Sequence, residues 1–255
     1  MHGEDIIALA ILERSGRLPD SGLYVDVGAF HPTFASNTAV LSERGWRGVC
    51  IEPNPLMADR LRTARPTDVV LEVAVGSSRR KGHLNFFYEW GSSNTLDEDF
   101  AAFISSTQSV EVSKRIEVDV VPLADILTEH VPAEASIDFM SIDVEGMDLE
   151  ALQSSDWKRF RPSLVAIEDL ELDLSNARSS PVFQFMTDVR YRFVAHAVYT
   201  SFYLRWDDQA QWLDVQRQAH DRAQGRTREA SPLARLARSA RSSRVARRLR
   251  TARGR

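Results

Sequence analysis

Residues 23–38 read Leu-Tyr-Val-Asp-Val-Gly-Ala-Phe-His-Pro-Thr-Phe-Ala-Ser-Asn-Thr, and this stretch decides the fold class. Its first five residues favour a strand, Gly28 allows a tight turn, and Ser36 or Asn37 is suited to cap a following helix. A strand, a glycine turn and a helix open a nucleotide-binding α/β unit, in which ligands bind beyond the carboxyl ends of the parallel strands. We therefore expect Asp26 and Gly28 to face a ligand.

The turn at Gly28 lacks the glycine pattern of a dinucleotide site. Such a site needs Gly-x-Gly-x-x-Gly, but Gly28 is followed by Ala29-Phe30-His31-Pro32. The backbone is therefore not prepared for a close approach to a pyrophosphate, which disfavours NAD and FAD. Taken alone, the motif also admits a simpler interpretation, in which Gly28 ends a buried strand and binds nothing.

The rest of the chain alternates strand and helix patterns, which predicts a mostly parallel sheet with helices on both faces. Together with a closing hairpin at residues 191–205, this alternation predicts a seven-stranded, doubly wound domain over residues 1–207. A polar loop at residues 91–96 is long enough to lie over a ligand. Further β segments are expected at residues 46–51, 69–75, 83–88, 110–121, 137–142 and 163–167, and helices at residues 4–14, 37–44, 55–64, 122–129 and 148–153.

The composition is that of a globular protein. Of the 255 residues, 43% are apolar, which is enough for a sizeable core. A single cysteine, Cys50, excludes an internal disulfide framework and fits a reducing compartment. The N-terminus does not have the basic and apolar segments of a secretory leader, and no apolar run has the length of a membrane span. We therefore expect a cytoplasmic protein.

The last part of the chain, residues 208–255, is a basic tail on an acidic body. It contains thirteen arginines and four acidic residues, although the whole chain has a formal net charge of −4. One interpretation is a disordered segment or a marginal helix. The functional alternative is peripheral contact with an anionic membrane, which would suit an enzyme with a membrane-borne acceptor. We expect no nucleic-acid binding, because aromatic residues are not interleaved with these arginines.

Glu52 marks the end of the second expected strand. An acidic residue at this place holds the two ribose hydroxyls in α/β nucleotide-binding domains, and Glu52 follows Asp26 at about the expected interval. The alternative is a strand-end carboxylate that is merely exposed to water. The segment Glu52-Pro53-Asn54-Pro55 also ends the strand and begins the next helix.

Several motifs in the same order resemble the FkbM family of S-adenosylmethionine-dependent methyltransferases, over about residues 4–205. The resemblance implies a class I methyltransferase fold, which is Rossmann-like, with S-adenosylmethionine as the methyl donor. It also implies an acceptor hydroxyl on a sugar, a glycolipid, a polysaccharide or a polyketide-type product. The motifs are Tyr24-Val25-Asp26-Val27-Gly28-Ala29-Phe30-His31-Pro32, Ser36-Asn37-Thr38, Gly45-Trp46-Arg47-Gly48, Ile51-Glu52-Pro53-Asn54-Pro55, Ile142-Asp143-Val144-Glu145-Gly146, Asp148-Leu149-Glu150 to Leu152, Trp157 and Arg161-Pro162.

The resemblance assigns donor-binding roles to individual positions. It places Asp26 and Gly28 in the loop around the methionine part of the donor and Glu52 at the ribose. From the fold we expect the adenine near Ala74 or Val75. Many members of the family carry a small, glycine-containing loop where this chain has Phe30-His31-Pro32; this departure bears on the detailed contacts to the donor carboxylate and not on the identity of the donor. The complete predicted donor-binding set is Asp26, Gly28, Ala29, Ser36, Asn37, Glu52, Ala74 and Val75.

Three acidic residues form a second candidate group. Asp143 follows one expected strand, and Glu168 and Asp169 follow the next. Carboxylates in one cleft repel each other unless a cation or protons lie between them, and magnesium or manganese suits a set of oxygen ligands. The arrangement resembles the metal sites of sugar and catechol O-methyltransferases. The alternative is that Glu168 and Asp169 belong to an acidic run with neighbouring residues.

The predicted function is S-adenosylmethionine-dependent O-methylation of a carbohydrate or glycolipid hydroxyl, assisted by a divalent metal. For the general base we prefer Glu145, with His31 second, and Asp143 completes the catalytic set. We interpret His196 as a structural histidine. Two other functions stay open: a binding module that has lost catalysis, and a nucleic-acid methyltransferase recruited by the basic tail.

Overall fold

The computed structural model describes residues 3–206. The predictions about residues 208–255 therefore lie outside the described residues, and contact of the basic tail with anionic lipid stays a prediction. Within residues 3–206, no helix is both long enough and apolar enough to cross a bilayer.

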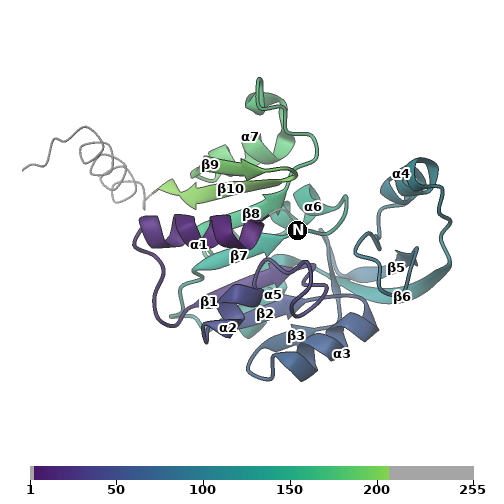
Figure 1. The fold of residues 1–255 in the computed structure, drawn as a ribbon, viewed down its shortest axis with the longest axis horizontal. Helices are drawn as coiled ribbons and strands as arrows, with labels where there is room; N and C mark the ends of the chain where they lie inside the picture. Colours follow the sequence, from purple (N-terminus) through teal and green to yellow (C-terminus); the bar gives the residue numbers. More distant parts are fainter. Residues whose placement is uncertain (1–2, 207–255) are drawn as a thin grey trace, which may run out of the picture. The chain divides into compact units, whose positions relative to one another are not determined.

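The main sheet has seven strands in the order β3-β2-β1-β7-β8-β10-β9 (Figure 1). The first five strands in this order pair in parallel, and β10 runs antiparallel to both β8 and β9. This order confirms the predicted class I methyltransferase architecture with a C-terminal hairpin. The strands are β1 Leu23–Val27, β2 Arg47–Ile51, β3 Val69–Leu71, β7 Phe139–Ile142, β8 Leu164–Glu168, β9 Tyr191–Ala197 and β10 Thr200–Arg205.

Strand β1 lies at the point where the chain reverses its direction across the sheet. After β1 the chain adds β2 and β3 on one side, and it later returns to add β7 and β8 on the other side. The loops after β1 and β7 leave from neighbouring strand ends and diverge, so a crevice opens between them. The segments that follow β1, β2, β7 and β8 are therefore the expected place of the ligand site.

Within residues 3–206, three helices cover each face of the main sheet. Leu12, Leu41 and Leu61 pack on the face that contains Tyr24, because successive side chains of a strand point to opposite faces. Leu127 packs on the other face. Figure 1 shows α1 crossing the first face near β7 and β8. The first face is covered by α1 Glu4–Arg14, α2 Ala39–Glu43 and α3 Pro55–Ala64, and the second by α5 Leu123–His130, α6 Asp148–Gln153 and α7 Pro181–Asp188.

A second sheet of three strands, in the order β4-β6-β5, was not predicted. The single strand expected at residues 69–75 is divided: β3 joins the main sheet, and β4 pairs in parallel with β6. The helices α4 and α7 were also missed, although Asp97 and Ser180 cap them with their side chains. The additional elements are β4 Ala74–Val75, β5 Arg80–Phe86, β6 Lys114–Val121, α4 Glu98–Gln108 and the short 3-10 helix Ala177–Ser179.

The predicted cap of α2 was wrong. The residue at the N-cap is Thr38, and no side chain bonds to the exposed amides of the first turn. The hydroxyl of Thr38 instead donates to Asp26, Ser36 bonds to Arg65, and Asn37 donates to Ser141. The side chains that could cap the helix are therefore used to fix the loop before it.

Candidate functional site

A hollow of about 590 Å³ opens beyond the carboxyl ends of β1 and β2, and we call it the first hollow. Most of its wall is apolar, and the polar residues in it are Glu52, Asn54, Ser92, Asn94, Asp143 and Glu145. Four residues of the predicted donor set line it: Gly28, Glu52, Ala74 and Val75.

Glu52 is fixed at the floor of the first hollow by two backbone amides. Its Oε2 accepts a hydrogen bond from the amide of Phe30 at 2.8 Å, and its Oε1 accepts one from the amide of Asn54 at 2.8 Å. Burial raises the pKa of Glu52 to about 7, although both amide bonds lower it. Each carboxylate oxygen keeps a further lone pair, so Glu52 can accept hydrogen bonds from a ligand.

Residues 87–96, which we call the roof segment, cover the first hollow. Asn94 holds the segment in shape: its side chain accepts from the amide of Phe87 at 3.1 Å and donates to the carbonyl of Tyr88 at 3.1 Å. The guanidinium of Arg60 stacks on the ring of Trp90 at 3.6 Å and ties the segment to α3. The roof segment contains the polar loop that was expected to lie over a ligand.

Gly28 brings the β1 turn into contact with the loop after β7. Its φ of +79° is a conformation that favours glycine, and a Cβ atom at this position would lie 1.8 Å from the carbonyl oxygen of Asp143. The amides of Gly28 and Ala29 both donate to the carbonyl of Ile51. The absence of a side chain at Gly28 therefore allows three loops to meet at the floor of the site.

A second hollow, of about 660 Å³, adjoins the first and is more polar. The two hollows share Gly28, Phe30, Ser92, Asp143 and Glu145, so the two acidic residues stand at their boundary. A ligand in one hollow and a ligand in the other would therefore meet beside Asp143 and Glu145. The second hollow is also lined by Glu4, Ala35, Asn37, Glu168, Tyr199 and Thr200.

The backbone at Glu145 is held in an unusual conformation by side chains on both sides. Glu145 has a φ of +53°, which costs energy for a residue with a side chain. Asp148 accepts from the amides of Val144 and Gly146, and the hydroxyl of Thr95 donates to the carbonyl of Glu145 at 2.7 Å. Burial and the neighbouring charge of Asp143 raise the pKa of Glu145 to about 8. A carboxylate with this pKa is suited to take a proton near neutral pH.

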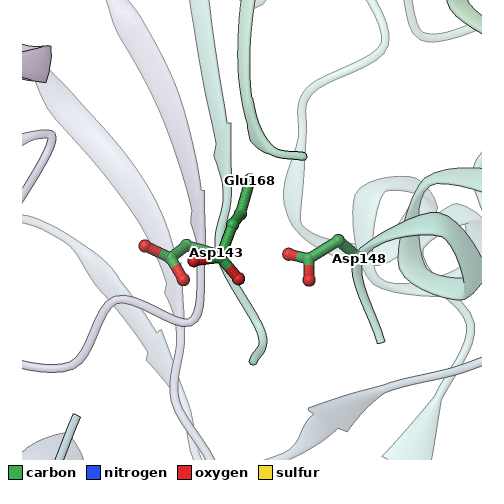
Figure 2. A group of neighbouring side chains, drawn as sticks. All are labelled: Asp143, Asp148 and Glu168. Atoms are coloured by element: carbon green, nitrogen blue, oxygen red, sulfur yellow. The ribbon is translucent and has the colours of Figure 1, made fainter. Parts of the chain in front are cut away.

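Asp143, Asp148 and Glu168 form an acidic cluster in which each residue offers an oxygen within 4.8 Å of the others. Figure 2 shows that they come from three elements, the end of β7, the start of α6 and the end of β8, and that Glu168 lies between the other two in this view. Burial, then the repulsion of Asp143, raises the pKa of Glu168 to about 10. Within residues 3–206, the buried Oε2 of Glu168 has no hydrogen-bond partner.

The acidic cluster fits a divalent cation by its chemistry. Three carboxylates supply oxygen ligands only, which magnesium and manganese prefer, and leave room for water and substrate oxygens. Burial also raises the pKa of Asp143 to about 6 and that of Asp148 to about 7, so all three groups are destabilised in their charged form. A cation would remove this destabilisation and would satisfy the unpaired oxygen of Glu168.

Two predicted residues lie away from this cluster. Asp169 was expected to be a metal ligand, but its carboxylate accepts from the hydroxyl of Ser180 at 2.8 Å, and Asp148 takes the third place beside Asp143 and Glu168. His31 was the second candidate for the base. Its Nδ1 accepts from the amides of its own turn, and the ring lines a separate hollow beside α3, so the geometry does not support a role in proton transfer at the boundary.

Three residues of the predicted donor set lie behind the first hollow instead of lining it. Asp26 accepts from Thr38 in a buried network, and Ser36 accepts from the guanidinium of Arg65 at 2.9 Å in the same network. Ala29 is buried in the core beneath α1. These residues fix the loop after β1 from behind. Asn37 lines the second hollow and donates to Ser141 at 3.1 Å.

Sequence reasoning assigned no role to several residues of the site, among them Asn54 and Asp148. Asn54 lines the first hollow and donates to the carbonyl of Glu89, which links α3 to the roof segment. Asp148 was placed at the start of a helix and in one of the family motifs, but it was not predicted to be a metal ligand. Its signal was present, since an acidic residue five positions after Asp143 begins the helix that follows the predicted metal ligand. Phe30, Ser92, Asn94, Leu96 and Met147 also line the first hollow.

Comparison with known proteins gave one family match and several distant structural similarities. Residues 26–193 match a family described as the methyltransferase FkbM domain. No curated protein sequence matches the chain. The similar solved structures include a precorrin-6y C5,15-methyltransferase from Geobacter metallireducens GS-15 (13% identity over 78% of this chain and 88% of that chain, TM-score 0.39). Another is a TehB-like SAM-dependent methyltransferase from Corynebacterium glutamicum ATCC 13032 Kitasato (9% identity over 80% of this chain and 88% of that chain, TM-score 0.39). A third is an O-methyltransferase from Bacillus cereus in complex with SAH (13% identity over 79% of this chain and 80% of that chain, TM-score 0.37).

Proposed function

The chain belongs to the FkbM family of methyltransferases, and from this we propose that it transfers a methyl group from S-adenosylmethionine to a hydroxyl of a sugar, a glycolipid or a polysaccharide. The observation that carries the proposal is the meeting of two hollows at Asp143 and Glu145. One hollow has the apolar wall and strand-end carboxylate of a nucleoside site. The other is polar, as a site for a hydroxylated acceptor should be.

The first hollow supports a particular orientation of the donor. Ala74 and Val75 offer an apolar surface for the adenine, and Glu52 offers two fixed oxygens for the ribose hydroxyls. The methionine part would then extend past Gly28 toward the boundary with the second hollow. In this orientation the donor, when bound, supplies an electrophilic methyl group on a sulfonium at the boundary.

Glu145 is the residue best placed to accept the proton of the acceptor hydroxyl. It stands at the boundary of both hollows, and its raised pKa makes it an effective base near neutral pH. The acceptor oxygen forms a bond to the methyl carbon as the bond from that carbon to sulfur breaks. The hydroxyl proton passes to a carboxylate oxygen of Glu145. The hydrogen bonds that Thr95 and Asp148 make with the backbone around Glu145 fix the loop that carries this residue.

We further propose that Asp143, Asp148 and Glu168 hold a divalent cation. Bound there, magnesium or manganese would lower the pKa of the acceptor hydroxyl. Glu168 and Asp143 line the second hollow, where the acceptor is placed, so the ligand set and the proposed acceptor site are adjacent.

Replacing Glu52 by alanine should weaken binding of the donor product, S-adenosylhomocysteine, by about 1–3 kcal/mol, because hydrogen bonds to a charged group are removed. Calorimetry measures the change. The matched control is Glu43→Ala, at an exposed position at the end of α2, which should leave the affinity unchanged. If Glu52→Ala stays folded by circular dichroism and binds the product as tightly as the original protein, Glu52 does not hold the ribose.

Donor binding should strengthen as the pH rises from about 6 to 8. In the free protein, burial raises the pKa of Glu52 to about 7. Hydroxyl groups of the donor that bond to the carboxylate favour its charged form and lower this pKa. Binding therefore releases a proton in this pH range. Calorimetry at several pH values, in buffers of different ionisation enthalpy, detects the proton. Glu52→Gln cannot titrate and should lose this part of the pH dependence. An unchanged dependence in that variant would assign it to another group.

The enzymatic proposal is tested by incubating the protein with methyl-labelled S-adenosylmethionine and three sets of acceptors: sugars, glycolipids and oligonucleotides. We expect label on a sugar or glycolipid, with an oxygen-linked methyl group identified by mass spectrometry and NMR. Label on oligonucleotides alone would favour the nucleic-acid alternative. Tight binding of the donor product without transfer to any acceptor, sugars and glycolipids included, would favour a binding module.

A further inference from the structure

A third hollow, of about 840 Å³, is lined by two residues of the acidic cluster and by none of the residues that line the first hollow. It is bounded by α4, the loop before α6, the segment after β8 and the start of α7. The third hollow shares Glu168 with the second hollow and also contains Asp148. A ligand whose hydroxyl lies beside the acidic cluster can therefore extend into the third hollow.

The charged residues that line the second and third hollows are acidic. In the part of the chain that the structure describes, the residues that line these two hollows include no Lys, Arg or His. A phosphate or carboxylate on the acceptor would therefore meet no cationic side chain among these lining residues. The acidic residues of the third hollow are Asp97, Asp99, Asp148, Glu168, Asp169 and Glu171.

Two of these carboxylates are free to bind a ligand. Asp97 caps α4 by accepting from the amide of Phe100, and Asp169 accepts from Ser180. Asp99 and Glu171 are exposed, and among the described residues their carboxylates take part in no hydrogen bond or ion pair. Both line the third hollow, Asp99 from α4 and Glu171 from the segment after β8.

Two aromatic rings stand beside these carboxylates. Phe100 and Phe103 line the third hollow, and their ring centroids lie 6.2 Å apart. Phe103 is 56% exposed, although it is a large apolar side chain. The face of an aromatic ring attracts cations, and ammonium groups are bound by aromatic rings together with acidic side chains. The carboxylates and the rings are separate features, and both favour a cation that carries apolar groups.

We propose that the third hollow binds a protonated amine of the acceptor, so that the substrate is an amino sugar or a related compound that carries a hydroxyl and an ammonium group. This inference rests on the proposed function for the position of the hydroxyl. The ammonium lies near Asp99, Glu171 and the ring of Phe103, and the hydroxyl lies at the acidic cluster. The acidic lining of the third hollow disfavours acceptors that would place a phosphate or a carboxylate in that hollow.

The test begins with binding, because binding does not require turnover. The probes are methyl glycosides of 2-amino, 3-amino and 4-amino sugars, each with its N-acetyl derivative, added to the full-length protein with S-adenosylhomocysteine and magnesium. We expect at least one free amine to bind at least about tenfold more tightly than its N-acetyl derivative. The preference should shrink as salt is added, because charge attraction is screened. Equal binding within every pair would overturn the inference.

A variant pair assigns the preference to the third hollow. The double variant Asp99→Asn, Glu171→Gln should lose most of the preference for the amine while it binds S-adenosylhomocysteine normally. Glu111→Gln is the matched control: it removes an exposed carboxylate that lines none of the three hollows, and it should keep the preference. A preference that survives in the double variant would remove the amine from this hollow.

The amine inference and the proposed function fail in different ways. Methyl transfer to neutral and amino sugars at the same rate, together with equal binding, would overturn the amine inference and leave O-methylation standing. Selective binding of free amines without methyl transfer to any hydroxyl would leave the amine site standing and contradict the proposed reaction. Transfer of the label to the amine nitrogen instead of oxygen would contradict both assignments.

Discussion

Excess chelator should abolish methyl transfer, and added magnesium or manganese should restore it. The expectation follows from the acidic cluster of Asp143, Asp148 and Glu168, whose oxygens lie within 4.8 Å of one another and whose charged forms are destabilised by burial. Donor binding should survive chelation, because the proposed adenine and ribose contacts are made by the wall and floor of the first hollow. Initial rates with and without chelator, and calorimetry with the donor product, separate the two effects.

Asp143→Asn keeps the shape of the side chain and removes one charge from the acidic cluster. It should raise the metal concentration needed for activity and lower the rate by at least about a hundredfold, as is usual for the loss of a metal ligand or a base. Asp169→Asn is the matched control, because Asp169 follows Glu168 but bonds to Ser180. It should leave the metal requirement unchanged. Full activity in excess chelator would contradict the metal assignment and leave Glu145 as the sole base.

Gly28→Ala should abolish donor binding and methyl transfer together. The new Cβ atom would lie 1.8 Å from the carbonyl oxygen of Asp143, and a backbone atom cannot move aside without moving the loop after β7. That loop carries Glu145, so one substitution displaces the floor of the first hollow and the base. We expect activity to fall by at least about a hundredfold, since misplacement by 1 Å can cost this much. Rates and calorimetry measure both losses.

Gly45→Ala separates the steric clash at Gly28 from backbone strain. Gly45 also has a positive φ, of +85°, but an added Cβ atom would meet nothing within 4 Å. This control should cost about 1–2 kcal/mol of stability from the left-handed conformation alone, with little change in activity. If both variants lose the same stability and keep donor binding, contact between the β1 turn and the loop after β7 does not organise the site.

The strand ends of the site were predictable from sequence because their signals are local. Gly28 follows a run of strand-forming residues, and Glu52 is followed by two prolines that end a strand and begin a helix. Each position depends on residues within a few places along the chain. The second sheet was missed because β4 has two residues and pairs with β6, more than forty positions later. Local patterns carry little information about such a short, distant pairing.

The place of Asp169 outside the acidic cluster has a local reason. Asp169 follows the last residue of β8, and its carboxylate accepts a hydrogen bond from Ser180. Glu168 turns toward the acidic cluster, and Asp169 turns toward Ser180. The loop after β7 brings Asp148 close to Asp143 and Glu168. Sequence spacing alone does not reveal the path of such a loop. The ring of His31 is likewise engaged locally, because its Nδ1 accepts hydrogen bonds from the amides of its own turn.

The hydrogen bond from Thr95 to the carbonyl of Glu145 joins the end of the roof segment to the loop that carries the proposed base. Thr95 is also paired with Asn85 of β5 through two backbone hydrogen bonds, so one residue connects the second sheet, the roof segment and the loop after β7. If the roof segment moved when the donor enters, this connection would pass the movement to the backbone of Glu145. The position of the proposed base would then depend on whether the donor is enclosed, and donor and acceptor would bind in a fixed order.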